Sequence, residues 1–264
     1  MNALNTVDWS LLAAPFAAGL LVLATHVPLG REVLKRGIIF IDLAIAQVAG
    51  LGVMLAKMLE WRHSEATLGL AAIDPATQLT AAAAACAGAL LLTWSGKRWP
   101  EIQEALIGLL FVFAASAGIL LLAHNPHGGE HLKDMLAGQI LWVTWSQLAL
   151  PAAIYVAILV FWFVLRQRFG DGGFYLLFAL TVTFSVQLVG VFLVFTSLIA
   201  PAIASRGCEG GRGLLFAYGI GALGYALGLA ASAWWDMPSG AAIACVLCLL
   251  AGVGLRLRPV HQSA

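Results

Sequence analysis

Long apolar segments alternate with short polar connectors along this 264-residue chain. A helix needs about 20 apolar residues to cross a hydrocarbon core about 30 Å thick. Seven windows meet that requirement, at approximately 9–29, 38–58, 76–95, 104–124, 139–165, 214–234 and 239–255. The pattern predicts an all-α fold, a polytopic bundle of about eight or nine membrane helices.

A further apolar segment, 174–204, is 31 residues long. As a single helix it would measure about 46 Å, which is too long for one crossing and short for two. We therefore expect a hairpin of two short or broken helices here, turning near 187–190 and interrupted again at Pro201. Such irregular backbone is tolerated at membrane depth only where protein or a cavity surrounds it.

Composition agrees with a membrane location, since 61% of residues are hydrophobic and only 10% are charged. No polar stretch is long enough for a separate soluble module, so we expect one transmembrane domain over 1–264. The net charge of +1 with scattered basic residues gives no reason to expect nucleic-acid binding. The chain has neither a Walker A loop nor a Ser-His-Asp or Cys-His arrangement at one depth, so we expect no enzyme activity of its own.

Basic residues predict the topology. Eleven of the fourteen lysines and arginines lie in the connectors 30–37, 96–103, 166–173 and 205–213 and in the C-terminal tail. The positive-inside rule places these segments in the cytoplasm, with the N-terminus outside and the C-terminus inside.

Two carboxylates lie just inside the apolar windows. Asp42 falls about one turn into the window 38–58, where a charge is costly unless it faces a partner or a water-filled cavity. Its position near a helix end also fits a carboxylate stabilised by the helix dipole. Gln47 follows about 140° further round the helix and need not share the face of Asp42. Alone, such a residue is typical of interhelical hydrogen bonding.

Glu104 opens the window 104–124, where an acid in the first turn is an ordinary helix N-terminal preference. Both carboxylates are expected at similar depth near the cytoplasmic side. If they are also close in space, they can hold a hard or borderline divalent cation.

An outer loop carries half of the six histidines of the chain. His124, His127, Glu130 and His131 occur within eight positions, and imidazole with carboxylate suits zinc, manganese or iron. This pattern indicates either a metal-capture loop or a solvated loop whose histidines have no joint role.

Four stretches resemble the membrane permeases of ABC transporters that import zinc, manganese or iron. They are PLGREVLKRGIIFIDLAIAQVAGLGV, EALIGLLFVFAASAGILLLAH with LKDMLAGQILWVTWSQL, VQLVGVFLVFTSLIAPAIASR and SAWWDMPSGAAIACV. In this resemblance Asp42 matches an intramembrane aspartate and Glu104 matches the acid that opens a later helix. The motif positions Gly190, Pro201, Asp236, Pro238 and Gly240 match in structural roles.

The resemblance implies a type II ABC importer permease that works as a homodimer in the bacterial inner membrane. It implies a cytoplasmic ATP-binding subunit and an external metal-binding protein as partners, with membrane lipid around the helices. It also implies zinc or manganese as the transported ion, and no covalently bound cofactor. By this resemblance Asp42 and Glu104 would line the path, and Gln47 is a further candidate from the residues themselves. Arg31, Lys35, Arg36 and Arg206 lie in the loops 30–37 and 205–213, which are the candidates for the ATPase contact if the coupling runs outside the shortened segment 166–173.

Two departures from the family pattern affect this expectation. The family histidine one turn after the aspartate is replaced by Ala46, which leaves an oxygen-rich site. The longer cytoplasmic segment that resembles the docking element for the ATPase is reduced to 166–173. Two rival functions therefore remain: a secondary transporter that needs no ATPase, and a membrane scaffold that transports nothing.

Overall fold

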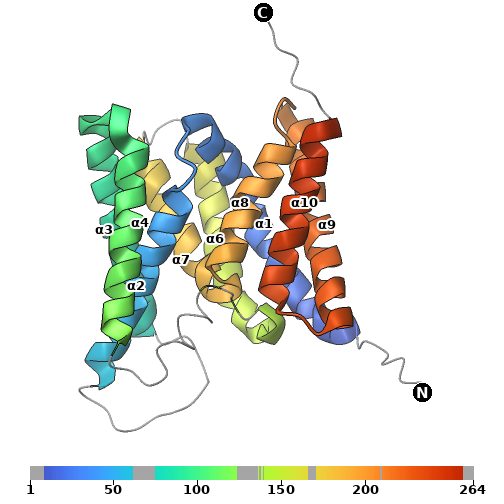
Figure 1. Cartoon of the computed structure of the whole chain (residues 1–264), viewed down its shortest axis with the longest axis horizontal. Helices are drawn as coiled ribbons and strands as arrows, with labels where there is room; N and C mark the ends of the chain where they lie inside the picture. Colours follow the sequence, from blue (N-terminus) through green and yellow to red (C-terminus); the bar gives the residue numbers. More distant parts are fainter. Residues whose placement is uncertain are drawn as a thin grey trace, which may run out of the picture. The chain divides into compact units, whose positions relative to one another are not determined.

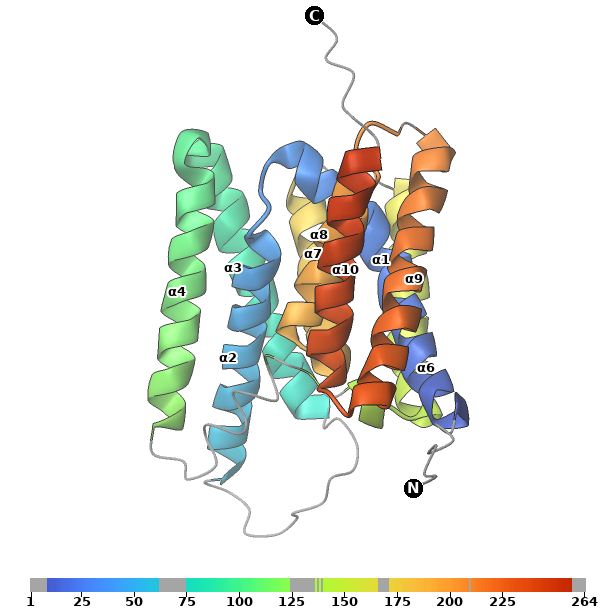
Figure 2. The ribbon, with the colours of Figure 1, turned by 45° about the vertical axis from the view of Figure 1, so that its right-hand side comes forward.

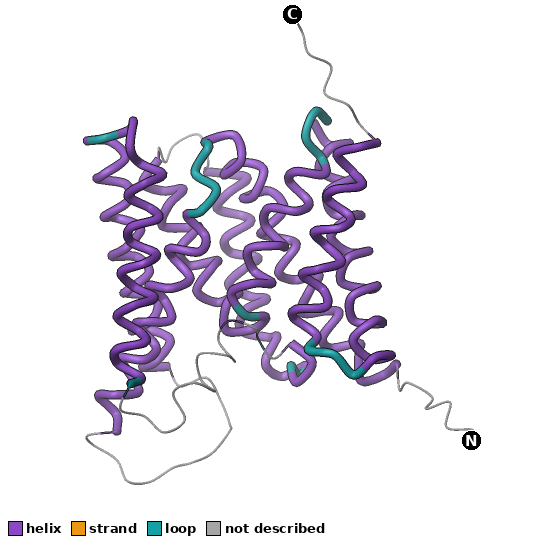
Figure 3. The backbone as a smooth tube through the Cα atoms, in the orientation of Figure 1, coloured by secondary structure: helices purple, strands orange, loops and turns teal. Residues whose placement is uncertain are grey.

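The computed structural model describes residues 9–61, 75–123, 136, 138, 140–165, 171–208 and 210–257. Within these ranges every regular element is helical and no strand occurs, as Figures 1 and 3 show. The α-helices are α1 (Ala13–Arg36), α2 (Ile41–Trp61), α3 (Pro75–Arg98), α4 (Gln103–Leu122), α6 (Trp145–Leu165), α7 (Asp171–Val189), α8 (Val191–Ala204), α9 (Gly210–Trp235) and α10 (Ser239–Leu257). Short 3-10 helices cover η1 (Trp9–Leu12), η2 (Pro100–Ile102) and η3 (Ile140–Trp142).

These helices confirm the predicted all-α membrane fold. Seven of those described are long and apolar enough to cross a membrane by length and composition. Two shorter apolar helices accompany them, Ile41–Ala56 within α2 and Val191–Ala204, which is α8. The window 139–165 is divided more finely than predicted, because η3 precedes α6 and α6 begins only at Trp145.

The long segment 174–204 is broken as expected, but only once. Gly190 separates α7 from α8 with a φ of 82°, a left-handed conformation that favours glycine. The second interruption that we expected, at Pro201, is wrong, since α8 continues through this proline to Ala204. A proline is tolerated in a membrane helix where neighbouring groups satisfy the freed backbone carbonyl.

The first connector is also shorter than predicted, because α1 continues through Pro28 and Gly30 to Arg36. Pro28 has no N–H, so the carbonyl of Ala24 loses its usual donor within the helix. The hydroxyl of Tyr218 in α9 donates to that carbonyl at 2.9 Å. A neighbouring helix therefore restores the bond that the proline removes, and the positions 30–36 belong to a helix.

The chain forms two compact units, each built from separate stretches of sequence. Unit 1 comprises Met1–Lys35, Ala137–Ala152 and Leu188–Ala264, and unit 2 comprises Arg36–Leu136 and Ala153–Gln187. The expectation of one transmembrane domain stays a prediction.

In unit 2, α2 packs against both α3 and α4, and Figure 2 shows these three helices grouped together. Small residues permit the close approach: a Cβ on Gly52 would lie 2.8 Å from the Ala84 methyl group of α3. On the other side, Gly118 of α4 faces the Met54 sulfur. Close packing through small residues is typical of membrane helices, where no hydrophobic effect drives association.

In unit 1, α10 packs against both α8 and α9. A Cβ on Gly228 of α9 would lie 2.4 Å from the Ile243 Cα atom of α10, and one on Gly224 would lie 2.2 Å from the Leu247 side chain. These glycines therefore place the backbones of α9 and α10 in direct contact.

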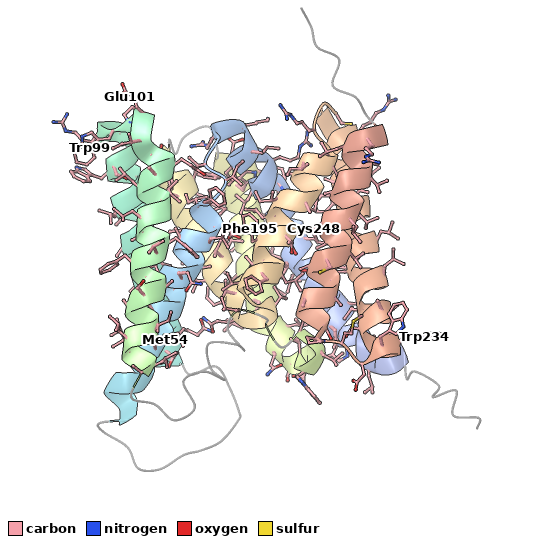
Figure 4. All side chains as sticks on the ribbon, in the orientation of Figure 1. Met54, Trp99, Glu101, Phe195, Trp234 and Cys248 are labelled. Carbon is pink, nitrogen blue, oxygen red and sulfur yellow. The ribbon has the colours of Figure 1, made fainter. Side chains whose placement is uncertain are left out.

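Basic connectors gather at one end of each unit. In unit 2, the Arg36 guanidinium lies 4.3 Å from the centre of the Phe174 ring, which joins the last residue of α1 to the start of α7. Trp99 lies at the same end, between α3 and α4 (Figure 4). In unit 1, Arg31 donates to the carbonyl of Cys208, which joins the end of α1 to the connector before α9. This grouping agrees with the predicted topology, and which side of the membrane it faces stays a prediction.

Candidate functional site

Asp42 is the second residue of α2 and its side chain is completely buried. The helix begins after a turn at Gly37, whose φ is 69°, and the N–H of Ala44 already bonds to the carbonyl of Phe40. Neither carboxylate oxygen of Asp42 has a hydrogen-bond partner in the described part of the chain. The position in the first turn fits stabilisation by the helix dipole. Complete burial without a partner, however, is costly for a carboxylate and is not typical of a solvated helix cap.

Glu104 is the second residue of α4 and is half-buried. Its Oε1 atom accepts a hydrogen bond of 3.2 Å from the backbone N–H of Phe40. Its Oε2 atom is buried and has no partner among the described residues. Glu104 therefore caps α2 from a neighbouring helix and touches the chain two residues before Asp42.

The contact of Glu104 with Phe40 places the first turns of α2 and α4 side by side, and each of these turns carries one of the two carboxylates that the sequence singled out. Three buried carboxylate oxygens have no partner there, Oδ1 and Oδ2 of Asp42 and Oε2 of Glu104. Such oxygens are the donors that hard divalent cations prefer. Within the described ranges, no three His, Cys, Asp or Glu side chains are grouped closely enough to hold a metal ion. The role of these carboxylates in a cation path stays a prediction.

Gln47 is buried in α2, with 5% of its surface exposed. It lies about 140° round the helix from Asp42, so the two side chains leave α2 on different faces. Its role in the path stays a prediction. The histidine-rich loop with His124, His127, Glu130 and His131 lies outside the described residues, and its role in metal capture also stays a prediction.

The four basic residues expected to contact an ATPase lie in different settings. Lys35 and Arg206 are exposed. The Arg36 side chain packs over an aromatic ring in unit 2. Arg31 is partly buried and donates to two backbone carbonyls, those of Cys208 at 2.8 Å and Gly210 at 3.4 Å. Arg31 therefore holds the connector between α8 and α9, a role that the sequence did not indicate.

A buried histidine in unit 1 also escaped the sequence analysis. His26 of α1 is fully buried, and its Nε2 atom has no hydrogen-bond partner within the described ranges. The available signal was an ionisable residue inside an apolar window, which points to function by default.

Polar contacts between other helices were likewise not predicted. In unit 2, Gln78 of α3 and Gln187 of α7 exchange two amide hydrogen bonds of 2.5 and 2.9 Å. In unit 1, the hydroxyl groups of Ser197 and Tyr225 are 2.8 Å apart. The sequence shows these residues in apolar windows, but only the fold pairs them.

Comparison with known proteins places the chain in a family. The sequence profile of the ABC 3 transport family matches residues 8–171 and 169–256. An uncharacterized membrane protein of Synechocystis sp. is 27% identical over 191 residues, which cover 64% of this chain and 68% of the relative.

A solved structure has the same fold, PsaBC from Streptococcus pneumoniae in complex with Fab. The similarity has a TM-score of 0.75 and covers 97% of this chain and 95% of the other, at 18% sequence identity. The profile match extends over nearly the whole chain, and the helices have the length and composition of membrane spans. The chain therefore belongs to the ABC 3 transport family.

Proposed function

We propose that this protein is the transmembrane subunit of an ABC importer for a divalent metal ion, zinc or manganese. The observation that carries the proposal is the buried carboxylate of Asp42, which has no partner among the described residues of a chain from a transport family. Leaving a charged group buried and unpaired costs several kcal/mol, of order 2 to 4. A site of this kind is favoured when a cation passes beside it during the transport cycle.

Glu104 is the second contact for the ion. Its Oε2 atom has no partner among the described residues, and its Oε1 atom binds the backbone just before α2, the helix that carries Asp42. Carboxylate oxygens bind both manganese and zinc, so this pair alone does not select between them. Gln47 would lie further along the path. The histidine-rich outer loop would receive the ion from a separate binding protein.

The transport cycle would need partners. A cytoplasmic ATP-binding subunit would supply the energy, and two copies of this chain would form the path in the bacterial inner membrane. The exposed cations Lys35 and Arg206 are candidates for the ATPase contact. Large apolar side chains on α4, including Phe113 and Leu120, are exposed and would face lipid or the second copy.

The test is metal accumulation in cells that lack the chain and then receive wild-type or variant copies. Asp42→Asn keeps the size of the side chain but removes its charge, and we expect it to abolish uptake of the transported metal. Asp42→Glu keeps the charge and should retain part of the uptake. Glu101→Gln is the matched control, because Glu101 is exposed in η2 and should tolerate the loss of charge.

Zinc, manganese and iron content would be measured together, with immunoblots to confirm equal amounts of each variant in the membrane. Full uptake by Asp42→Asn would refute the role of the buried carboxylate. Uptake that persists after ATP is depleted would instead select a secondary transporter. Unchanged metal content in cells without the chain would favour a scaffold.

A further inference from the structure

His26 lies near the middle of α1, a 24-residue membrane helix of unit 1. Its imidazole is completely buried, although histidine is rarely placed deep in an apolar helix without a role. The α2 helix, which carries Asp42, contains no histidine. The imidazole of His26 is therefore a nitrogen donor that the two carboxylates do not supply.

The hydrogen bonds of His26 define which ring nitrogen carries the proton. Its Nδ1 atom lies 3.0 Å from the carbonyl oxygen of Val22, one turn earlier in the helix. A carbonyl oxygen only accepts, so Nδ1 must carry the hydrogen and donate it. The Thr25 hydroxyl also donates to the Val22 carbonyl and lies 3.2 Å from Nδ1, which agrees with this assignment.

The second ring nitrogen, Nε2, is then an unprotonated acceptor with a free lone pair. It is buried and has no partner in the described part of the chain. This is the arrangement of histidines that bind metal ions, in which one nitrogen donates to a backbone carbonyl and orients the other toward the ion. A histidine with only a packing role would leave this buried acceptor unsatisfied, an energetic cost that a leucine would avoid.

The helix face of His26 shows what surrounds it. Gly19, Leu23 and Gly30 share a sector of about 60° with His26 at 100° per residue. Gly19 lies against the Tyr225 ring, Leu23 against Gly221, and Gly30 against the Leu198 carbonyl. His26 therefore points toward the seam where α1 meets α8 and α9.

That seam also holds the paired hydroxyl groups of Ser197 and Tyr225, so it is not wholly apolar. From these observations we infer that Nε2 of His26 is a transient ligand of the transported cation and selects zinc over manganese. The inference rests on the proposed function. Imidazole nitrogen suits zinc and other borderline cations, whereas manganese prefers carboxylate and carbonyl oxygen. A single nitrogen ligand binds weakly enough to release the ion, as transport requires.

Two substitutions separate the ring nitrogens. His26→Asn places an amide near the position of Nδ1, where it can still donate to the Val22 carbonyl, and leaves nothing at Nε2. His26→Gln places an amide oxygen or nitrogen near Nε2 and thus replaces the borderline donor with a harder one. Thr25→Val is the matched control, because it removes the neighbouring hydroxyl and retains the imidazole.

The assay is the initial rate of radioactive zinc and manganese uptake by cells that express each full-length variant. We expect the ratio of zinc to manganese uptake to fall by about tenfold or more in both His26 variants, since even outer-shell changes at metal sites cost 10- to 100-fold. Manganese uptake should persist, most clearly in His26→Gln, and Thr25→Val should keep a ratio close to that of the wild type.

A second measurement guards against loss of folding. Zinc K-edge absorption spectra of the purified full-length protein, with His124, His127 and His131 replaced by alanine, should show an imidazole signal that His26→Asn weakens. An unchanged uptake ratio in His26→Asn, or an equal fall of both metals with no change in the spectrum, would overturn the inference. Failure of the proposed function is distinct, because then the wild-type chain itself would restore no metal uptake.

Discussion

Replacing Gly30 with alanine should separate two helices of unit 1. An alanine Cβ at this position would lie 2.1 Å from the carbonyl oxygen of Leu198 in α8, whereas ordinary contact begins at 3.4 Å. The nearest atom belongs to the backbone, so no side chain can rotate away and the helices must move apart by more than 1 Å. Overpacking of this kind costs about 1–3 kcal/mol, and the backbone contact favours the upper end.

Alanine also favours the helix over glycine by up to about 1 kcal/mol, which offsets part of that cost. The expected net loss is about 2 kcal/mol, or about a 30-fold fall in the ratio of folded to unfolded protein. Unfolding of the purified chain by sodium dodecyl sulfate in mixed micelles would measure it.

The control is Gly219→Ala in α9, because nothing lies within 4 Å of a Cβ at that position. It has the same gain in helix propensity with no clash, so it should leave stability unchanged or raise it slightly. Equal stability of the two variants, or greater stability of Gly30→Ala, would show that α1 and α8 do not approach as described.

Two further predictions concern polar contacts. Arg31→Ala should free the connector between α8 and α9, so hydrogen exchange of its backbone amides should rise, whereas Arg212→Ala at an exposed position should not change it. If this connector docks the ATPase, metal uptake should also fall in Arg31→Ala. Connector amides that stay protected from exchange in this variant would contradict the role of Arg31 in holding the connector. Gln78→Leu should cost about 1 kcal/mol by leaving the Gln187 amide unpaired, and the double leucine variant should recover most of it. If the stability losses of Gln78→Leu and Gln187→Leu simply add in the double variant, the pairing of Gln78 with Gln187 is refuted.

The number and class of the helices were predictable because membrane spans depend on hydropathy and length, which are local properties of the sequence. The break at Gly190 was predictable for the same reason, since 174–204 is too long for one crossing. The extent of α1 was not predictable, because the carbonyl freed by Pro28 is satisfied by Tyr218, which lies almost 200 positions later. A rule that proline ends a helix fails wherever a distant side chain replaces the missing bond.

The candidate site, like the fold, was only partly predictable from the sequence. The cost of a charge in an apolar helix is a property of Asp42 itself, so the sequence identified it. The contact of Glu104 with the backbone of Phe40 depends on packing of α4 against α2, and no spacing within either helix encodes it. His26 carried a sequence signal, but only its hydrogen bond to the Val22 carbonyl identifies Nε2 as the free atom.

The chemistry of the unpartnered atoms indicates the sign of the cargo. Four buried side-chain atoms in the described ranges have no hydrogen-bond partner: Nε2 of His26, Oδ1 and Oδ2 of Asp42, and Oε2 of Glu104. The oxygens of ionised carboxylates only accept, and Nε2 accepts once Nδ1 carries the proton. A path for an anion would need the opposite, buried donors or cations facing the path, as in anion-selective pores. Unpartnered acceptors of this kind, considered in each unit by itself, suit a positive ion, and for this reason the proposed function is cation transport and not anion transport.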